Sequence, residues 1–456
     1  MTTKEMKVIV IGGGTAGTVA ALTLTGMRRN FNVTLISLEK YPEYSRCSLP
    51  YIISGKIKNY RDIIVYTEKF LEKVGINVLL EHEASKIDTR EKKVEVLNRR
   101  SNEVEYLKYD ALIICTGSSP IIPRGIKIED GANVFTFSTL DDALNIKRRI
   151  SKVDRSVIVG GGLIGLELAE ALVELGVHVT IVERDWILCS LLDEDISSYV
   201  KGRILENCDH DSLKILEKCT VTEIGDGYVK LGNGETLESD LTVIATGVVP
   251  NVKLARRSGI EIGKSGAIKV NARLETNVKQ IYAAGDCAES TFLGHPIRTA
   301  LGSIAFRRGI IAAMNVSGEN MCVKEPTLAM TSKIFNIEIA AAGLPSQTLS
   351  KMGISFLFSK AKVDDKPSYI SERKPVLVKL FSTSQGRVIG CQLVGERAAT
   401  MINEVSAVMY SALPVSELLH YESAYAPLLS DILSPIEKAA RKLQIRLKRS
   451  IMKSSM

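Results

Sequence analysis

The stretch MKVIVIGGGTAGTVAALTL, residues 6–24, decides the fold. A continuous apolar run from Lys7 to Ile11 meets a glycine turn and then an alanine-rich helical pattern, which predicts a strand, a tight turn and a helix. Gly12, Gly14 and Gly17 have GxGxxG spacing. Such glycines permit the bend, the close approach of a pyrophosphate to the backbone, and the packing of helix on strand. The stretch therefore predicts a dinucleotide-binding βαβ unit.

The sequence has a carboxylate, Glu39, at the position where a dinucleotide-binding unit binds the ribose. Glu39 follows the second apolar run, residues 32–37, about 20 residues after the glycine turn, as a ribose-binding carboxylate should. We therefore predict that Glu39 binds the ribose of the first dinucleotide.

The same pattern occurs a second time in SVIVGGGLIGLELAEALVELG, residues 156–176. Its turn glycines are Gly160, Gly162 and Gly165, and Glu183 ends the next apolar run. A carboxylate there would hold the ribose 2′-hydroxyl of NADH, whereas the adjacent Arg184 could meet the 2′-phosphate of NADPH. The chain thus predicts two bound dinucleotides, with NADH favoured and NADPH left open.

Size and charge set broad limits on the 456-residue chain. Its length suits about three domains. The net charge of +7 is a mild, evenly spread excess, which argues against nucleic acid as a partner. The opening apolar run is too short for a secretory signal, and no run approaches membrane-spanning length. We therefore expect a cytoplasmic protein without membrane contact, and we interpret the basic tail, residues 438–456, as a solvated helix.

Two similar strings, ALIICTGSSP at 111–120 and LTVIATGVVPN at 241–251, are apolar strands broken by Thr-Gly and resemble exits from nucleotide domains. After about Pro326 the pattern changes to short strands at 376–381 and 388–394 and a helix at 398–413. We therefore predict an α/β protein with two Rossmann-like domains and a C-terminal α+β domain. The expected segments are 1–118, 119–245, 246–325 and 326–456.

The eight cysteines form no CxxC pair and no Cys/His cluster at metal-ligand spacing, so we expect neither a disulfide framework nor a metal. Cys115 and Cys391 lie in apolar runs and are interpreted as small buried hydrophobes. Cys47 differs because it precedes a short segment with Pro50 near its first helical turn. A thiolate there would face free backbone N–H groups, which lower a thiol pKa.

The string TNVKQIYAAGD at 276–286 resembles the second FAD-binding motif of the pyridine nucleotide-disulfide oxidoreductases. The resemblance implies that Asp286 binds the flavin ribityl chain and that the following helix points its N-terminus at the pyrophosphate. It also implies the order FAD half, NAD(P) insertion, FAD half and C-terminal dimerisation domain. By this resemblance Thr116 and Gly117 join the cofactor-binding residues.

The string EKYPEYSRCSLPYIISG at 39–55 is similar to the single-cysteine branch of that family, which contains coenzyme A disulfide reductases, NADH oxidases and peroxidases, and persulfide or polysulfide reductases. A CxxxxC pair is absent because position 52 is Ile. The resemblance implies that Cys47 is the redox cysteine and that Glu167 lies beside flavin and nicotinamide. It also implies that Tyr369 and Tyr425 reach the substrate sulfur across a homodimer interface.

The oxidases and peroxidases of this branch carry a histidine where this chain has Thr15. The absence of that acid/base group favours a small-molecule disulfide, persulfide or polysulfide substrate, with coenzyme A derivatives as candidates, reduced by NAD(P)H through FAD and Cys47. Two alternatives stay open at this point. One is an NADH oxidase that forms peroxide or water, and the other is a flavoprotein reductase of a small electron-carrier protein.

Overall fold

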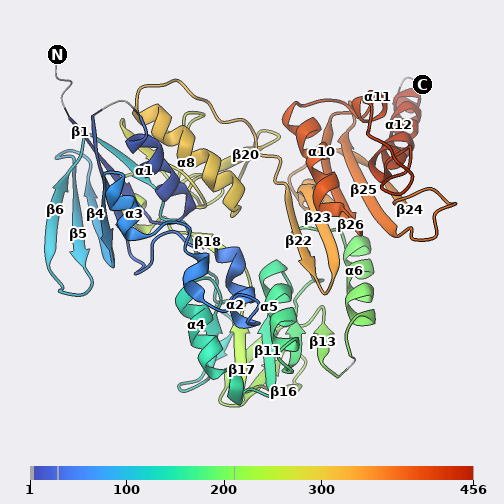
Figure 1. Ribbon diagram of the computed structural model, residues 1–456, viewed down its shortest axis with the longest axis horizontal. Helices are drawn as coiled ribbons and strands as arrows, with labels where there is room; N and C mark the ends of the chain where they lie inside the picture. Colours follow the sequence, from blue (N-terminus) through green and yellow to red (C-terminus); the bar gives the residue numbers. More distant parts are fainter. Residues whose placement is uncertain (1–4, 28–29, 210, 455–456) are drawn as a thin grey trace. The chain divides into compact units, whose positions relative to one another are not determined.

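A computed structural model describes residues 5–27, 30–209 and 211–454, so the first four residues and the last two of the basic tail lie outside the described residues. The chain divides into two compact units, each of which is described by itself (Figure 1). The first comprises Met1–Ile121, Ser138–Leu140 and Val248–Pro326, and the second comprises Ile122–Phe137, Asp141–Gly247 and Thr327–Met456.

A parallel five-stranded sheet with the order β19-β7-β1-β2-β3 organises the first unit. Its strands are β1 (Met6–Ile11), β2 (Phe31–Ser37), β3 (Ile76–Leu80), β7 (Ala111–Ile114) and β19 (Ile281–Ala283). The order reverses direction between β1 and β7. Ligands of open α/β sheets bind beyond the carboxyl ends of the strands at such a reversal.

Both faces of this sheet are buried, as its continuous apolar strands require. Helices α1 (Thr15–Thr25) and α8 (Gly302–Val316) cover one face, where Val8 and Val10 join their core (Figure 1). Ile9 and Ile11 point to the other face and pack with an antiparallel sheet of β4 (His82–Asp88), β5 (Lys93–Asn98) and β6 (Val104–Lys108). The unit also contains η1 (Arg46–Ser48), α2 (Leu49–Ile53), η2 (Tyr60–Ile63), α3 (Glu68–Lys73), α7 (Lys253–Arg257), and the strand pairs β8 (Ser118–Pro120) with β18 (Val248–Pro250) and β20 (Ser290–Phe292) with β21 (His295–Ile297).

The second unit repeats the parallel arrangement in the order β10-β17-β11-β12-β13. The strands are β10 (Val134–Thr136), β11 (Arg155–Val159), β12 (His178–Val182), β13 (Leu213–Leu216) and β17 (Leu241–Ile244). The surrounding elements are α4 (Leu140–Arg149), η3 (Ile150–Lys152), α5 (Leu163–Val173), α6 (Glu194–Glu206), and a small sheet of β9 (Lys127–Ile128), β14 (Val221–Gly225), β15 (Tyr228–Leu231) and β16 (Thr236–Glu238). Here the reversal lies between β11 and β17.

The rest of the second unit is the predicted α+β region. Its antiparallel sheet has the order β22-β23-β26-β25-β24, formed by β22 (Met330–Ile334), β23 (Ile337–Gly343), β24 (Phe356–Asp364), β25 (Pro375–Thr383) and β26 (Val388–Val394). Helix α10 (Ala398–Tyr410) packs on β23 and β26, and α12 (Pro435–Ser454) packs on β24 and β25. Two shorter helices are α9 (Ser346–Lys351) and α11 (Glu417–His420). The α/β fold class and the C-terminal α+β domain are therefore confirmed.

The expected helix at 398–413 was too long at its C-terminal end. It stops at Tyr410 because Ala412 adopts a left-handed φ of +55° and Pro414 follows, which cannot continue a helix. The burial predicted for two cysteines is confirmed, since Cys115 and Cys391 are both buried.

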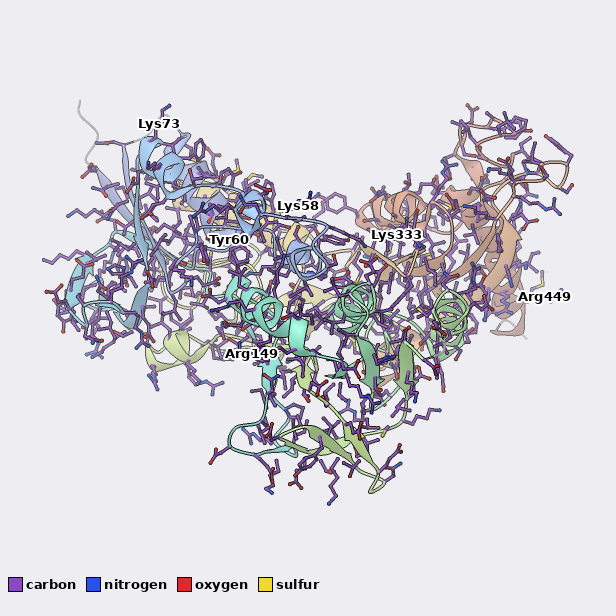
Figure 2. The ribbon with its side chains drawn as sticks, turned by 60° about the horizontal axis from the view of Figure 1, so that its bottom comes forward. Lys58, Tyr60, Lys73, Arg149, Lys333 and Arg449 are labelled. Carbon is purple, nitrogen blue, oxygen red and sulfur yellow. The ribbon has the colours of Figure 1, made fainter. Side chains whose placement is uncertain are left out.

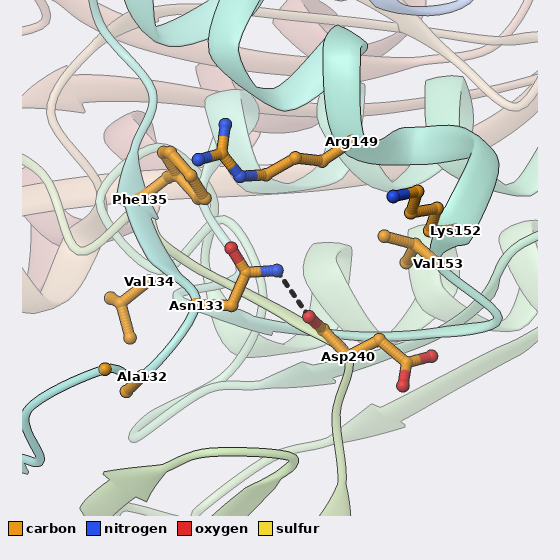
Figure 3. A pocket seen from close by; sticks show the side chains of 9 residues that line it. Ala132, Asn133, Val134, Phe135, Arg149, Lys152, Val153 and Asp240 are labelled. Atoms are coloured by element: carbon orange, nitrogen blue, oxygen red, sulfur yellow. Dashed lines mark hydrogen bonds between the residues drawn. The ribbon is translucent and has the colours of Figure 1, made fainter.

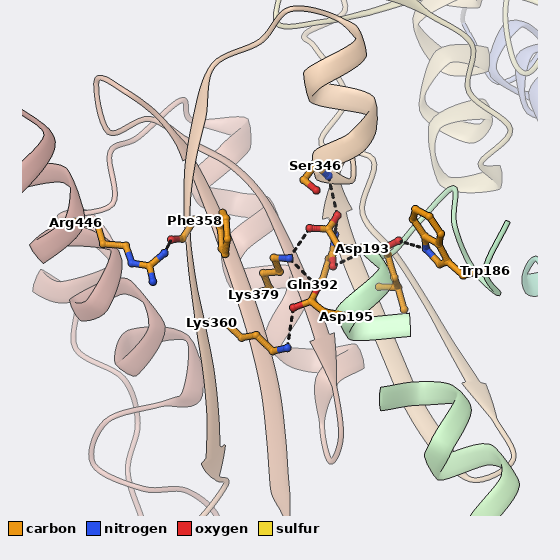
Figure 4. Close-up of polar contacts among 10 residues, drawn as sticks. Trp186, Asp193, Asp195, Ser346, Phe358, Lys360, Lys379, Gln392 and Arg446 are labelled. Atoms are coloured by element: carbon orange, nitrogen blue, oxygen red, sulfur yellow. Dashed lines mark hydrogen bonds and ion pairs between the residues drawn. The ribbon is translucent and has the colours of Figure 1, made fainter. Parts of the chain in front are cut away.

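A buried ionic network ties α6 to the antiparallel sheet (Figure 4). Lys379 Nζ lies 2.6 Å from Asp193 Oδ2 and 2.8 Å from Asp195 Oδ1. The Ser346 N–H and the Gln392 amide donate to Asp193 Oδ1 at 2.7 and 3.2 Å. Because a buried charge that loses its partner costs several kcal/mol, roughly 3–5, this cluster fixes α6 against the sheet.

The basic excess of the sequence comes from separate elements. Figure 2 labels Lys73 of α3, Arg149 of α4, Lys333 of β22 and Arg449 of α12. Among the described residues, none of the helices is both long enough and apolar enough to span a membrane.

Candidate active site

The first glycine turn lies at the reversal point of the first sheet, and its backbone has room for a ligand. Gly12 has a φ of +118°, and a Cβ there would stand 2.0 Å from the Cys115 carbonyl oxygen, so only glycine brings β1 and β7 this close. A Cβ on Gly14 would meet nothing within 4 Å. Gly14 is the N-cap of α1, whose free N–H groups suit a phosphate.

A pocket opens beside this turn, and polar residues line it. Its lining comprises Gly13, Gly14, Ser37, Glu39, Tyr41, Pro42, Glu43, Tyr44 and Arg46. The Tyr44 hydroxyl donates to Glu39 Oε2 at 2.6 Å. Arg46 forms an ion pair with Glu39, donates to the Tyr44 hydroxyl at 2.9 Å and to the Ser138 carbonyl at 2.9 Å. The predicted Glu39 therefore lies in this pocket together with Arg46, which the sequence did not indicate.

Asp286 lies at the same edge of the sheet, just beyond β19. The Ser118 hydroxyl donates to Asp286 Oδ2 at 2.8 Å, and burial raises the pKa of this carboxyl although that hydrogen bond opposes the shift. Thr116 donates to the Asn251 carbonyl at 2.7 Å, and the Asn251 N–H donates to the Gly117 carbonyl at 2.9 Å. The Thr-Gly string is thereby fixed beside Asp286. The expected following helix, α8, begins only after the hairpin β20–β21.

These residues suit FAD. Arg46 interacts electrostatically with Asp286 as well as pairing with Glu39, so a cation stands among the two carboxylates predicted to bind the ribose and ribityl hydroxyls. A guanidinium and a helix N-terminus are the groups that bind a pyrophosphate. The glycine turn, the two carboxylates and Arg46 would therefore hold the dinucleotide.

Cys47 is exposed and lies on η1, directly after Arg46. The short helix α2 begins two residues later with Pro50 in its first turn, as the sequence predicted. The thiol thus has a cationic neighbour in sequence and belongs to the unit that carries Glu39 and Asp286. Cationic, accessible surroundings are those in which a thiolate is nucleophilic.

The second glycine turn repeats the geometry of the first. Gly160 has a φ of +113°, and a Cβ there would lie 2.4 Å from the Ala245 carbonyl oxygen at the end of β17. A Cβ on Gly165 would stand 2.1 Å from the Gly160 oxygen, whereas one on Gly162 would meet nothing within 4 Å. The N-terminus of α5 therefore faces a second open cradle.

Glu183, directly after β12, is oriented by the backbone. The Gly161 N–H donates to its Oε2 at 2.7 Å, and the Asp185 N–H donates to its Oε1 at 2.9 Å. Arg184 is 78% exposed and lies 3.2 Å from Asp185. The ligand atoms of Glu183, Asp185 and Cys189 lie within 4.8 Å of one another, but the backbone N–H groups already satisfy the Glu183 carboxylate without an ion.

Glu167 lies on α5, one turn beyond the second glycine cradle. The Ser332 hydroxyl of β22 donates to its Oε1 at 2.5 Å. Burial raises its pKa against the effect of that bond. Ser332 is a second-unit residue that the sequence did not indicate.

The two predicted tyrosines come together although 56 positions separate them in the sequence. The hydroxyls of Tyr369 and Tyr425 lie 3.1 Å apart, and the side chains are 70% and 45% exposed. The hydrogen bond from Tyr369 raises the pKa of Tyr425. Both tyrosines belong to the second unit, and Cys47 belongs to the first.

The second unit also has a cavity of about 510 Å³ away from its cradle (Figure 3). Its lining includes Asn133, Phe135, Arg149 and Asp240, with the Arg149 guanidinium 5.0 Å from the centre of the Phe135 ring. The cavity lies at the amino ends of β10 and β17, opposite the edge at which dinucleotides bind, so it is not the nucleotide site.

Comparisons with known proteins agree with this geometry. The family model described as pyridine nucleotide-disulphide oxidoreductase matches residues 6–310, and that of the family's dimerisation domain matches residues 330–435. The chain is 33% identical over 448 residues to an NADH oxidase of Methanocaldococcus jannaschii, which covers 95% of this chain and 98% of that protein. It is 30% identical over 450 residues to a CoA-dependent NAD(P)H sulfur oxidoreductase of Pyrococcus furiosus. That match covers 97% of this chain and 100% of the relative.

Among solved structures, a NAD-dependent persulfide reductase from A. fulgidus superposes with a TM-score of 0.91 at 29% identity. The superposition covers 97% of this chain and 83% of that one.

Proposed function

We propose, since this chain belongs to the pyridine nucleotide-disulphide oxidoreductase family, that it is an FAD-dependent NAD(P)H oxidoreductase acting on a sulfur–sulfur bond through Cys47. The substrate class is a small-molecule disulfide, persulfide or polysulfide, with coenzyme A disulfide as the first candidate. We assign FAD binding to residues 1–118 and 246–325, and NAD(P)H binding to residues 119–245. A C-terminal dimerisation domain follows at residues 326–456.

The observation that carries this proposal is an exposed cysteine that directly follows Arg46, a residue of the pocket assigned to the first dinucleotide. Cys47 is accessible, follows Arg46 of the first pocket, and has Ile52 where a CxxxxC partner would stand. A lone accessible thiol must form its disulfide with the substrate. Bound FAD would supply the relay that takes two electrons from NAD(P)H to sulfur.

The residues of the chain then account for the sulfur chemistry. The Cys47 thiolate attacks one sulfur of RS–SR′, forms Cys47–S–SR and expels R′S⁻, which takes up a proton to leave as R′SH. Two electrons from NAD(P)H and one proton return Cys47 to the thiolate and release RSH. Tyr425, whose pKa is raised by its hydrogen bond with Tyr369, keeps its proton and is our proposed donor to the leaving sulfur.

The direct test is anaerobic oxidation of NADH by the purified protein with coenzyme A disulfide, polysulfide or glutathione disulfide, compared with oxygen. We expect rapid turnover with coenzyme A disulfide or polysulfide and slow turnover with oxygen. If oxygen is the only acceptor that supports turnover, the sulfur assignment is wrong.

A second candidate, an NADH oxidase, is favoured by the M. jannaschii relative, which carries that name at 33% identity. Thr15 counts against it, because this position lacks an acid/base side chain that could serve peroxide chemistry. A reductase of a small electron-carrier protein would leave Cys47 without a role. The same acceptor series separates the sulfur reductase from the oxidase, and a carrier-protein reductase would turn over rapidly with none of its acceptors.

We propose further that the protein is a homodimer in which Tyr369 and Tyr425 serve Cys47 of the partner subunit. The dimerisation-domain match supports the first part. Large apolar side chains beside Tyr425 support it as well: Leu428, Leu429 and Ile432 are 73%, 65% and 66% exposed. Several large, exposed apolar side chains within one short segment are typical of a protein interface.

We expect Leu428→Asp to dissociate the dimer, because the charge would be buried without a partner at the interface. Light scattering should show the monomer mass, and turnover with disulfide should fall at least about tenfold at equal FAD content. Val104→Asp is the matched control, since Val104 is 51% exposed on β6 of the other unit. A wild-type protein that is monomeric at working concentration removes both claims.

We expect Glu183→Ala to shift the nucleotide preference toward NADPH. Its carboxylate, fixed by the Gly161 and Asp185 N–H groups, should bind the ribose 2′-hydroxyl and repel a 2′-phosphate. Arg184 offsets this little because it pairs with Asp185. The ratio of kcat/KM for NADH to that for NADPH should fall about tenfold, equivalent to roughly 1.4 kcal/mol.

The control for this measurement is Glu206→Ala, an exposed carboxylate on α6. It should leave the nucleotide ratio unchanged. An unaltered ratio in Glu183→Ala would mean that Glu183 does not contact the ribose.

A further inference from the structure

Glu43 is a buried carboxyl that the function described above does not use. Its side chain is 7% exposed and lines the pocket formed by the first glycine turn, Glu39 and Arg46. The Thr15 hydroxyl of α1 hydrogen-bonds to the carboxyl, yet the Oε2 atom has no hydrogen-bond partner. A buried oxygen without a partner costs about 1–3 kcal/mol, so a ligand atom that satisfies Oε2 would recover this loss.

The backbone holds Glu43 firmly in this position. The Val65 N–H donates to the Glu43 carbonyl at 2.9 Å, and the Ser45 N–H donates to the Ile63 carbonyl at 2.9 Å. Tyr44 and Ile64 form a β-bridge between these two bonds. These backbone contacts therefore hold Glu43 in the wall of the pocket.

The charges around the pocket determine the protonation state in which Glu43 could bind a dinucleotide. The titratable groups that line it are Glu39, Tyr41, Glu43, Tyr44 and Arg46. Helix α1 contributes no charged residue, and the charged residues directly before segment 63–65 are the exposed Arg61 and Asp62. Arg46 balances Glu39, so an ionised Glu43 would add an uncompensated negative charge to a pocket that must receive a pyrophosphate.

We propose that Glu43 is a pH-dependent ligand of FAD, whose protonated carboxyl donates a hydrogen bond from Oε2 to the pyrophosphate of the bound dinucleotide. This rests on the proposed function, because it requires that the first pocket binds FAD. It adds a phosphate ligand outside the glycine turn, and it makes retention of the flavin depend on one proton.

The direction in which the pKa of Glu43 is shifted agrees with this role. Burial raises its pKa, and the hydrogen bond from Thr15 and the charge of Arg46 offset that only in part. If FAD binds the protonated form, the affinity is constant below the pKa of Glu43 in the free protein and falls above it. The dissociation constant then rises by about tenfold per pH unit until the pKa of the bound state is passed.

The test is FAD titration of the full-length, flavin-stripped protein, followed by flavin fluorescence from about pH 5 to about pH 9. Wild type should lose affinity as the pH rises. Glu43→Gln keeps an N–H donor that cannot ionise, so its dissociation constant should stay near the low-pH wild-type value throughout. Glu72→Gln, an exposed carboxylate of α3, is the matched control and should follow wild type.

A second measurement needs no variant. Calorimetric titration of the wild-type protein with FAD, in two buffers of different ionisation enthalpy, should show uptake of close to one proton per FAD above the pKa of Glu43. Proton uptake of zero, or a Glu43→Gln variant with the wild-type pH dependence, overturns the inference alone. Absence of FAD binding by wild type at every pH overturns the proposed function instead.

Discussion

Replacing Cys47 with serine should yield a protein that still holds FAD but reduces disulfides and polysulfides at least about a thousandfold more slowly. Serine keeps the size and polarity of the side chain, but its hydroxyl neither ionises at neutral pH nor forms a disulfide. The proposed FAD ligands, among them Gly12, Glu39 and Asp286, do not involve the sulfur. The variant should therefore be yellow and reducible by NADH.

Oxygen consumption should persist or rise in this variant, because electrons that no longer reach sulfur still reach dissolved oxygen. Cys322→Ser is the matched control, since Cys322 is also exposed in the first unit but, unlike Cys47, does not follow a residue that lines the pocket. Both variants are compared by anaerobic assays with coenzyme A disulfide and polysulfide at equal flavin content. Wild-type rates in Cys47→Ser would make Cys47 structural and favour an oxidase or a protein-partner reductase.

The strands and glycine turns of both nucleotide cradles could be predicted from the sequence for a local reason. Each apolar run is buried on both faces, and each turn contains a glycine that no other residue can replace. Met6–Ile11 and Arg155–Val159 accordingly form strands that end at Gly12 and Gly160. The carboxylates Glu39 and Glu183 followed from counting along the next strand, because parallel strands deliver their ends to one edge.

The polar contacts within the pocket could not be predicted in this way. Glu43 and Arg46 lie in PEYSR, a string that resembles a solvated loop, and the burial of Glu43 depends on Thr15 and on the segment 63–65 packed against it. Likewise, the contact of Tyr369 with Tyr425 joins two loops that only the tertiary fold brings together. Contacts between residues far apart in the sequence produce no periodic pattern, so the patterns that predict strands do not predict these contacts.

The roles of two glycines in the first turn should separate when each is changed to alanine. Gly12→Ala places a methyl group 2.0 Å from the Cys115 carbonyl oxygen and requires an L-residue at a φ of +118°. The backbone strain alone is on the order of 1–3 kcal/mol, before the overlap forces β1 and β7 apart. We therefore expect a large fall in the melting temperature of the flavin-free protein and no detectable FAD binding.

Gly14→Ala should behave differently, because its φ of −80° suits any residue and a Cβ there meets nothing within 4 Å. The flavin-free protein should melt within a few degrees of wild type. The added methyl group nevertheless occupies the open space at the N-terminus of α1 where we place the pyrophosphate, so FAD affinity should fall at least about a hundredfold. Thermal melts and FAD titrations of both variants check this. Wild-type FAD affinity in Gly14→Ala would mean that the phosphates do not lie on this turn, because a phosphate in contact with the N-cap backbone would clash with the added methyl group.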